Sequence, residues 1–166
     1  TAFNFPIAVW GWNACLAAIC GDSMIWKPSS KTPLTAVATT KIAEKVLKDH
    51  GFPGIMNLLV GRGSVVGEKM VNDRRIPLIS ATGSCKMGRR IGQAVAGRLG
   101  RSLLELGGNN AVIVLDDADL EMAMRAVLFG AVGTAGQRCT STRRLLLQKG
   151  IAGEMIENLL AAYAKV

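Results

Sequence analysis

The sequence predicts an α/β fold of three layers, in which helices cover both faces of a parallel β-sheet. One observation on the sequence and one general rule predict it. Short apolar segments with strand-like composition alternate with longer segments whose apolar residues recur at helical spacing. Strands separated by helices pair in parallel through right-handed crossovers, which place helices on both faces of the sheet.

The first strand and helix are bounded by residues with known end preferences. A short apolar strand is predicted at residues 24–28, where Pro28 ends it. A helix follows, because Thr32 is a favourable N-cap residue and Pro33 suits the first helical position. Apolar residues then recur at helical spacing until Gly51, which predicts the end of the helix.

The same alternation continues to the end of the chain. It changes character after the pair Gly107-Gly108, where a hinge between two domains, 1–106 and 107–166, is predicted. Strands are predicted at 55–60, 76–81, 102–106, 111–115 and 144–147, and helices at 64–72, 86–99, 119–132 and 152–164.

The composition is unusual for a free-standing domain. Apolar residues make up 49% of the chain, and 19 glycines in 166 residues add about 11%. Together that is roughly 60%, against the usual 45–50% with glycine included. The composition therefore favours a chain that is cut from a larger protein.

Several classes of function are excluded by composition. The net charge of +8 suggests nucleic-acid binding, but the basic residues are scattered and aromatic residues are only 5% of the chain. No apolar run reaches the ~18 residues that span a bilayer, and no basic n-region of a signal peptide is present. The four cysteines include no Cys-x-x-Cys pair, which indicates a reducing cytoplasm. We expect no nucleic-acid or membrane partner and no metal site.

Two glycine-rich loops compete for the role of phosphate binding. Residues 61–67 follow one predicted strand and precede a helix, close to a dinucleotide fingerprint, and residues 83–88 occupy the same place in the next unit. Either loop could direct backbone N–H groups at a pyrophosphate. A tight strand-to-helix turn explains each equally well, so spacing alone does not choose between them.

Cys139 is the candidate nucleophile. It lies in a polar, glycine-flanked segment, whereas Cys15 and Cys20 lie in an apolar helical run and are predicted to be core. An inert thiol is the commoner interpretation of a single cysteine, and a reactive one needs a stabilised thiolate. The only histidine, His50, is predicted to be solvated at a helix end, so a Cys–His mechanism is not supported.

Glu105 is the candidate general base. It is a single acid within an apolar strand and lies beside the flexible pair Gly107-Gly108. Burial of this carboxylate would favour proton abstraction. The alternative interpretation is an acid that is paired with a basic residue at a strand end.

Five short motifs stand in order along the chain: Ala2-Phe3-Asn4-Phe5-Pro6, Trp26-Lys27-Pro28, Thr82-Gly83-Ser84 with Gly88, Glu105-Leu106-Gly107-Gly108 and Gly136-Gln137-Arg138-Cys139. In their content and order they resemble the aldehyde dehydrogenase superfamily along the whole length of the chain. Glu105 also precedes Cys139 by the 34 residues that are typical of that superfamily. The resemblance implies an aldehyde dehydrogenase-like fold, with part of a Rossmann-type NAD(P)-binding domain at 1–106 and the N-terminal part of the catalytic domain at 107–166.

The resemblance also implies how a cofactor is held. It implies NAD, with NADP as the alternative, and it assigns the pyrophosphate to the second glycine loop and the adenosine ribose to Lys27. Ser30 stands where many NAD-preferring members carry a glutamate, which weakens the preference for NAD over NADP. The implied cofactor-binding residues are Thr1, Phe3, Lys27, Ser30, Gly67, Gly83, Ser84 and Leu106.

The implied chemistry is oxidation of an aldehyde to a carboxylic acid. Cys139 would attack the aldehyde and pass through a thiohemiacetal and a thioester, Asn4 and the Cys139 N–H would hold the oxyanion, and Glu105 would activate water. The family's later Glu-x-Phe-Gly-Pro segment is not among these residues. The intact enzyme is expected to be a homodimer or a homotetramer.

The segments at residues 4–6, 10–13, 107–111 and 131–140 are similar to those of the antiquitin group, which oxidises 2-aminoadipate 6-semialdehyde, the ring-opened form of piperideine-6-carboxylate, in lysine breakdown. Arg138 suits a substrate carboxylate, which a guanidinium binds bidentately, and Thr140 would border the substrate. A salt bridge within the protein is the alternative for Arg138. The alternative functions are a general aldehyde dehydrogenase, a CoA-acylating semialdehyde dehydrogenase, and an inactive fragment that binds cofactor only.

Overall fold

The computed structural model describes all 166 residues, which form two compact units, Thr1–Leu106 and Gly107–Val166. The strands pair in parallel, as the sequence predicts: the first with the second, the third with the fourth and the fifth with the sixth. The α/β class is therefore confirmed. The single sheet expected from the sequence is not formed within these residues, because the strands pair only two by two, as three separate sheets.

The first unit contains most of the predicted elements within one to three residues of their expected ends. The predicted helix at 64–72 is a π-helical turn, Gly63–Gly67, followed by a short α-helix. The apolar helical run before the first strand, which contains Cys15, also forms a helix. The elements are α1 Ala8–Ile19, β1 Met24–Trp26, α2 Pro33–Asp49, β2 Met56–Leu58, α3 Glu68–Asn72, β3 Leu78–Gly83, α4 Cys85–Gly97 and β4 Arg101–Leu106.

The helix ends show which of the residues at these positions cap or terminate a helix. Pro33 is in the first turn of α2, and Gly51 follows that helix with a φ of +84°, a conformation that glycine adopts without strain. Thr32 occupies the N-cap position, but its side chain makes no capping bond, contrary to the expectation. In α4 the Ser84 side chain does cap the helix, because it accepts a hydrogen bond of 3.2 Å from the Met87 N–H.

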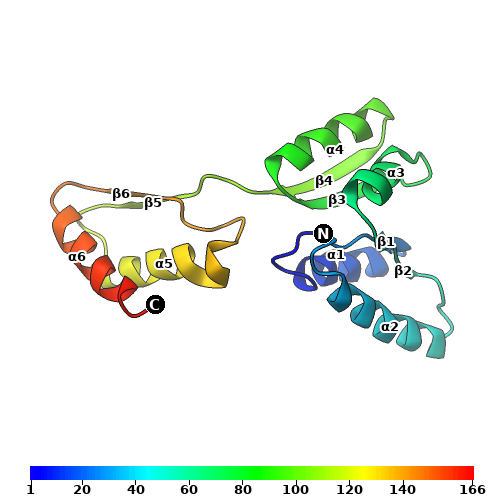
Figure 1. The fold of residues 1–166 in the computed structure, drawn as a ribbon, viewed down its shortest axis with the longest axis horizontal. Helices are drawn as coiled ribbons and strands as arrows, with labels where there is room; N and C mark the ends of the chain where they lie inside the picture. Colours follow the sequence, from blue (N-terminus) through cyan, green and yellow to red (C-terminus); the bar gives the residue numbers. More distant parts are fainter. The chain divides into compact units, whose positions relative to one another are not determined.

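The core of the first unit lies between the strand pair β3–β4 and its helices α3 and α4 (Figure 1). Val95 of α4 and Ile79 of β3 are buried together there. Because side chains alternate along a strand, Leu104 and Leu106 face α4, where they lie against its glycines. Glu105 points to the other face of β4 and is exposed.

Gly88 allows α4 to approach β4 closely. A Cβ atom at this buried position would lie 2.5 Å from Leu106 Cδ1, whereas a Cβ at Gly97 of the same helix would meet no atom within 4 Å. We expect Gly88→Ala to destabilise the protein by about 1–3 kcal/mol through overpacking. Gly97→Ala should instead be neutral or stabilise it by up to about 1 kcal/mol. Urea unfolding of the two variants side by side measures this difference, and equal effects would contradict it.

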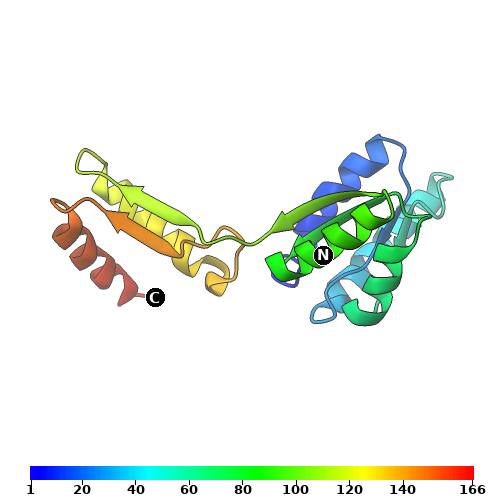
Figure 2. The ribbon, with the colours of Figure 1, turned by 90° about the horizontal axis from the view of Figure 1, so that it is seen from above.

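The second unit repeats the pattern of parallel strands with helices. Its strands run alongside each other in the same direction (Figure 2). Asp119 caps α5 by accepting a hydrogen bond of 3.0 Å from the Met122 N–H. The elements are β5 Ala111–Val114, α5 Leu120–Val132, a 3₁₀ turn at Gly133–Gly136, β6 Arg144–Leu147 and α6 Ala152–Tyr163.

The core of the second unit is formed by both helices on one face of the strand pair. Val127 of α5 and Met155 of α6 are buried together, and Leu145 and Leu147 of β6 pack against them. The alternate residues of the strands, such as Ile113, are exposed on the other face.

The cysteines and the histidine test the predicted burial. Cys15 lies on α1 and Cys20 directly follows it, and both are exposed, so their predicted place in a core is wrong for these residues. Their stretch is apolar all round, so periodicity could not show which side of the helix packs. His50 is exposed at the end of α2, as predicted. None of the helices is both long and apolar enough to cross a membrane.

Candidate active site

The first unit brings together several of the residues that the sequence assigns to a cofactor. The Lys27 ammonium donates hydrogen bonds to the carbonyl oxygens of Pro28 at 2.6 Å and Gly61 at 3.1 Å. A Cβ at Gly67 would lie 3.6 Å from Lys27 Cε, so the lysine passes directly over this glycine. Burial lowers the pKa of Lys27 from its ordinary value.

Two tryptophans hold the strand that carries Lys27. Trp26 is buried, stacks on Trp10 at 4.5 Å between ring centroids, and donates a hydrogen bond of 2.9 Å from Nε1 to the Thr1 hydroxyl. The Thr1 nitrogen in turn donates to the Lys27 carbonyl at 2.8 Å. Thr1, Lys27 and Gly67 therefore form one contiguous group.

Phe3 and Ser30 are more exposed than Thr1 and Lys27. The Phe3 ring is exposed, and the Lys31 ammonium lies 5.0 Å from its centroid. Ser30 is exposed in the loop between β1 and α2, and it takes no part in the hydrogen bonds around Lys27. The structure thus does not join Ser30 to the group formed by Thr1, Lys27 and Gly67.

The second glycine loop has the features of an anion site. Gly83 ends β3, and a Cβ there would lie 2.8 Å from Met87 Cε, so a larger residue would displace the Met87 side chain. Ser84 caps α4, whose first turn contains no acidic residue. The N–H groups and the positive end of a 13-residue helix are therefore directed at the loop. This donor set fits a dinucleotide pyrophosphate.

The burial of Glu105 differs from the one predicted. The carboxylate is exposed rather than buried, because β4 turns it away from the face that α4 covers. Its neighbour Leu106 is half-buried against Gly88, and Asn4 is half-buried in the segment before α1. An exposed carboxylate can accept a proton from water directly, so a general-base role does not depend on the burial expected from the sequence.

The second unit presents Cys139 on an ordered turn between α5 and β6. The thiol is exposed. The turn is fastened by Ser141, a fully buried residue whose hydroxyl accepts a hydrogen bond of 3.0 Å from the Arg138 N–H. The Ser141 N–H donates back to the Arg138 carbonyl at 3.2 Å. Thr140 is exposed next to the cysteine.

The backbone before this turn is strained. Thr134 and Ala135 have φ values of 56° and 53°, in the left-handed region that residues other than glycine rarely adopt. The Arg138 side chain crosses this segment: its Nε donates to the Thr134 hydroxyl at 3.0 Å, and its guanidinium carbon lies 4.5 Å from the Phe129 ring centroid. Arg138 is thus held by α5 and the strained turn, without a salt bridge.

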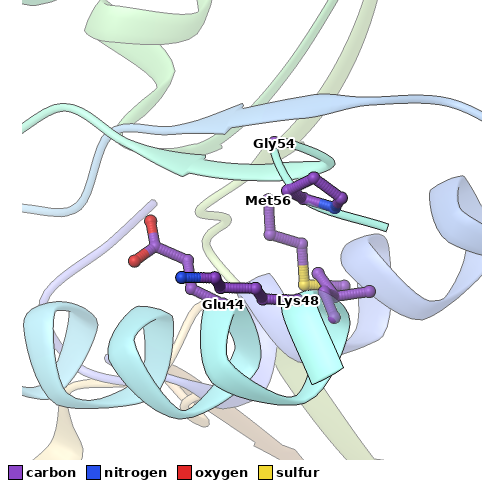
Figure 3. A pocket seen from close by; sticks show the side chains of 6 residues that line it. Glu44, Lys48, Gly54 and Met56 are labelled. Atoms are coloured by element: carbon purple, nitrogen blue, oxygen red, sulfur yellow. The ribbon is translucent and has the colours of Figure 1, made fainter. Parts of the chain in front are cut away.

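The predicted catalytic residues fall into both units. Asn4 and Glu105 belong to the first, whereas Arg138, Cys139 and Thr140 belong to the second. Their joint action in one site therefore stays a prediction. A separate shallow pocket between α2 and β2, lined by Glu44, Lys48, Gly54 and Met56 among others, contains none of the predicted residues (Figure 3).

Sequence reasoning missed the residues that hold the cysteine turn. Asn110 donates from its side-chain amide to the Cys139 carbonyl at 2.7 Å and the Ser141 carbonyl at 3.1 Å. A polar residue at the start of an apolar strand was the available signal, and it does not by itself name a partner. The buried hydroxyl of Ser141 has no signature in the sequence, because serine is usually exposed.

Known proteins resemble this chain over its full length. The Aldehyde dehydrogenase family profile matches residues 1–166. The "Aldehyde dehydrogenase family 7 member B4" of Arabidopsis thaliana is 51% identical over 166 residues, which is 100% of this chain and 33% of that protein. The "Alpha-aminoadipic semialdehyde dehydrogenase" of Bos taurus is 50% identical, with 100% of this chain and 31% of that protein covered.

Solved structures show the same likeness. A betaine aldehyde dehydrogenase from Staphylococcus aureus in complex with NAD⁺ has a TM-score of 0.93 at 36% identity, covering 99% of this chain and 32% of that one. Lactaldehyde dehydrogenase from Escherichia coli has a TM-score of 0.90 at 36% identity, covering 96% of this chain and 33% of that one. The chain therefore spans about a third of the length of the relatives it matches.

Proposed function

Because the chain belongs to the aldehyde dehydrogenase family, we propose that the full-length protein oxidises an aldehyde to a carboxylic acid with NAD(P) as the hydride acceptor. The observation that carries the proposal is an exposed thiol, Cys139, on a turn that hydrogen bonds hold in one conformation. Residues 1–106 would be part of the cofactor domain, and residues 107–166 the N-terminal part of the catalytic domain.

The cofactor site is proposed on the first unit. The α4 N-terminus with Gly83 and Ser84 would hold the pyrophosphate, and Lys27 with Gly67 and Thr1 would hold the adenosine ribose, with Phe3, Ser30 and Leu106 beside the cofactor. NAD(P), when bound, supplies the hydride acceptor. The Lys27 ammonium already has two carbonyl partners, so a ribose hydroxyl would take its third N–H donor.

The proposed reaction begins at Cys139. Its thiolate attacks the aldehyde carbon, a C–S bond forms, and the carbonyl oxygen becomes an oxyanion that the Asn4 amide and the Cys139 N–H stabilise. Departure of the hydride, with its two electrons, re-forms the carbonyl and leaves a thioester on Cys139. Glu105 then takes a proton from water as the water attacks the thioester. The C–S bond breaks, which releases the acid and restores the thiolate.

The proposed substrate is 2-aminoadipate 6-semialdehyde, in lysine breakdown. The bovine relative carries that activity in its name, and Arg138 offers a guanidinium next to the nucleophile. The bond to Thr134 uses Nε alone, so it leaves both terminal amino groups to pair with a substrate carboxylate, beside Thr140. In addition to this activity, we propose that the full-length protein is a homodimer or homotetramer in the cytoplasm and that it has neither nucleic acid nor membrane as a partner.

Steady-state kinetics of the full-length protein test this substrate. We expect kcat/KM for 2-aminoadipate 6-semialdehyde to exceed that for hexanal, with NAD or NADP and without CoA. Arg138→Leu should lower kcat/KM for the semialdehyde about 10- to 100-fold more than kcat/KM for hexanal, because only the semialdehyde loses a charge-assisted hydrogen bond, whereas both lose the contacts of Arg138 with Thr134 and Phe129. Equal losses for both aldehydes would contradict the substrate role of Arg138. A strict requirement for CoA would favour the acylating alternative.

A further inference from the structure

Asn110 is the residue that joins the start of β5 to the nucleophile turn. Its side-chain amide donates to the carbonyls of Cys139 at 2.7 Å and Ser141 at 3.1 Å. Its own carbonyl accepts from the N–H groups of Arg143 at 2.9 Å and Arg144 at 3.0 Å. One residue thus makes four hydrogen bonds to residues 139–144, all within the second unit.

These bonds fix the backbone on both sides of Cys139. The peptide group that follows the cysteine is held by the Asn110 amide on the Cys139 carbonyl. The peptide group that precedes it is held by the bond from Ser141 N–H to the Arg138 carbonyl, at 3.2 Å. The Cys139 N–H and thiol take part in none of these bonds. With both flanking peptide planes held, the directions of that N–H and of the Cα–Cβ bond are set.

We propose that Asn110 is a positioning residue for the reaction at Cys139: its side-chain amide holds the Cys139 peptide so that the thiol and the N–H keep the orientation that attack and oxyanion binding need. The inference rests on the proposed function. Its side-chain amide bonds the backbone of the nucleophile, so it would act through Cys139. Residues that the sequence resemblance assigns to the site do not include it.

Loss of the Asn110 amide should affect the rate of the chemical step more than the folding stability. Asn110 is half-buried and Cys139 is exposed, so water can solvate the Cys139 carbonyl if the amide is removed, whereas the carbonyl of buried Ser141 loses a partner and with it some folding stability. The chemical step is more sensitive, because a displacement of about 1 Å in a reacting group can lower its rate on the order of 10²-fold. Removal of the amide should therefore affect kcat more than stability or cofactor binding.

The test compares Asn110→Asp and Asn110→Ala with Asn109→Asp and Asn109→Ala in the full-length enzyme. Asn109 is the adjacent, exposed asparagine, and only its backbone carbonyl accepts hydrogen bonds, from Arg144. We expect both Asn110 variants to lower kcat by about 10- to 100-fold with an unchanged KM for NAD(P). Deuterium uptake of the peptide covering 137–142 should rise at least about fivefold. Both Asn109 variants should match the wild type in all three measurements.

Two outcomes separate this inference from the proposed function. If Cys139→Ala abolishes turnover but the Asn110 variants keep the wild-type kcat and deuterium uptake, the positioning role is wrong and the proposed function stands. If the wild type oxidises no aldehyde, the proposed function fails, and faster uptake confined to the Asn110 variants still supports the hold on the Cys139 turn. A matched fall in kcat for the Asn109 variants would also overturn the inference.

Discussion

In the full-length protein, we expect Cys139→Ala to lower kcat for aldehyde oxidation by at least about 10³-fold, because the proposed thioester forms on the Cys139 sulfur. The structure supports this expectation through the exposure of the thiol and through the bonds that order its turn. Binding of NAD(P) should persist, since the proposed cofactor residues lie in the other unit. Stopped-flow measurement of NAD(P)H formation, with cofactor titration beside it, gives both quantities.

Cys20→Ala is the matched control for this variant. Cys20 is also an exposed cysteine, but it lies directly after α1 and outside every group assigned to the reaction. Its replacement should leave kcat within about twofold of the wild type. Equal activity of the Cys139 and Cys20 variants would show that the nucleophile has been assigned to the wrong residue.

Glu105→Gln should separate the two halves of the reaction. Thioester formation does not need a base for water, so the first-turnover burst of NAD(P)H should keep its rate and amplitude. Hydrolysis does need one, so the steady-state rate should fall by about 10²–10⁴-fold. Rapid mixing of enzyme, aldehyde and cofactor resolves both phases in one trace.

Glu157→Gln serves as the control, because Glu157 is an exposed acid on α6 and no proposed step uses it. Its burst and steady-state rate should match those of the wild type. If Glu105→Gln slowed the burst and the steady state equally, Glu105 would act before or during hydride departure, and the role of hydrolytic base would be wrong.

Elements with a strong local signal were predictable from the sequence. Helix α2 begins at Pro33, whose ring fixes φ at a helical value, and ends at Asp49, just before Gly51, which adopts a positive φ that other residues rarely take. Strand β6 likewise agrees with its predicted range. The pairing of strands into three separate couples was not predictable, because parallel pairing depends on which strands are brought side by side by the whole fold.

The sequence names candidate residues for the site but not the environment of each one. Lys27, Gly67 and Thr1 lie together as a contiguous group, although the sequence separates them widely. The exposure of Glu105 was not foreseen, since an acid among apolar residues looks buried until the covered face of its strand is known. The role of Asn110 was not foreseen either, because its hydrogen-bond partners are backbone carbonyls, which every residue has and which no sequence pattern marks.

The central claim is that Cys139 carries the covalent intermediate of aldehyde oxidation. Full-length Glu105→Gln protein, mixed with aldehyde and NAD(P), quenched in acid and digested, should accumulate an acyl group on the peptide that contains Cys139, as detected by mass spectrometry. The peptides that contain Cys15, Cys20 and Cys85 should remain unmodified. NAD(P)H formation without any acyl group on the Cys139 peptide would contradict the claim.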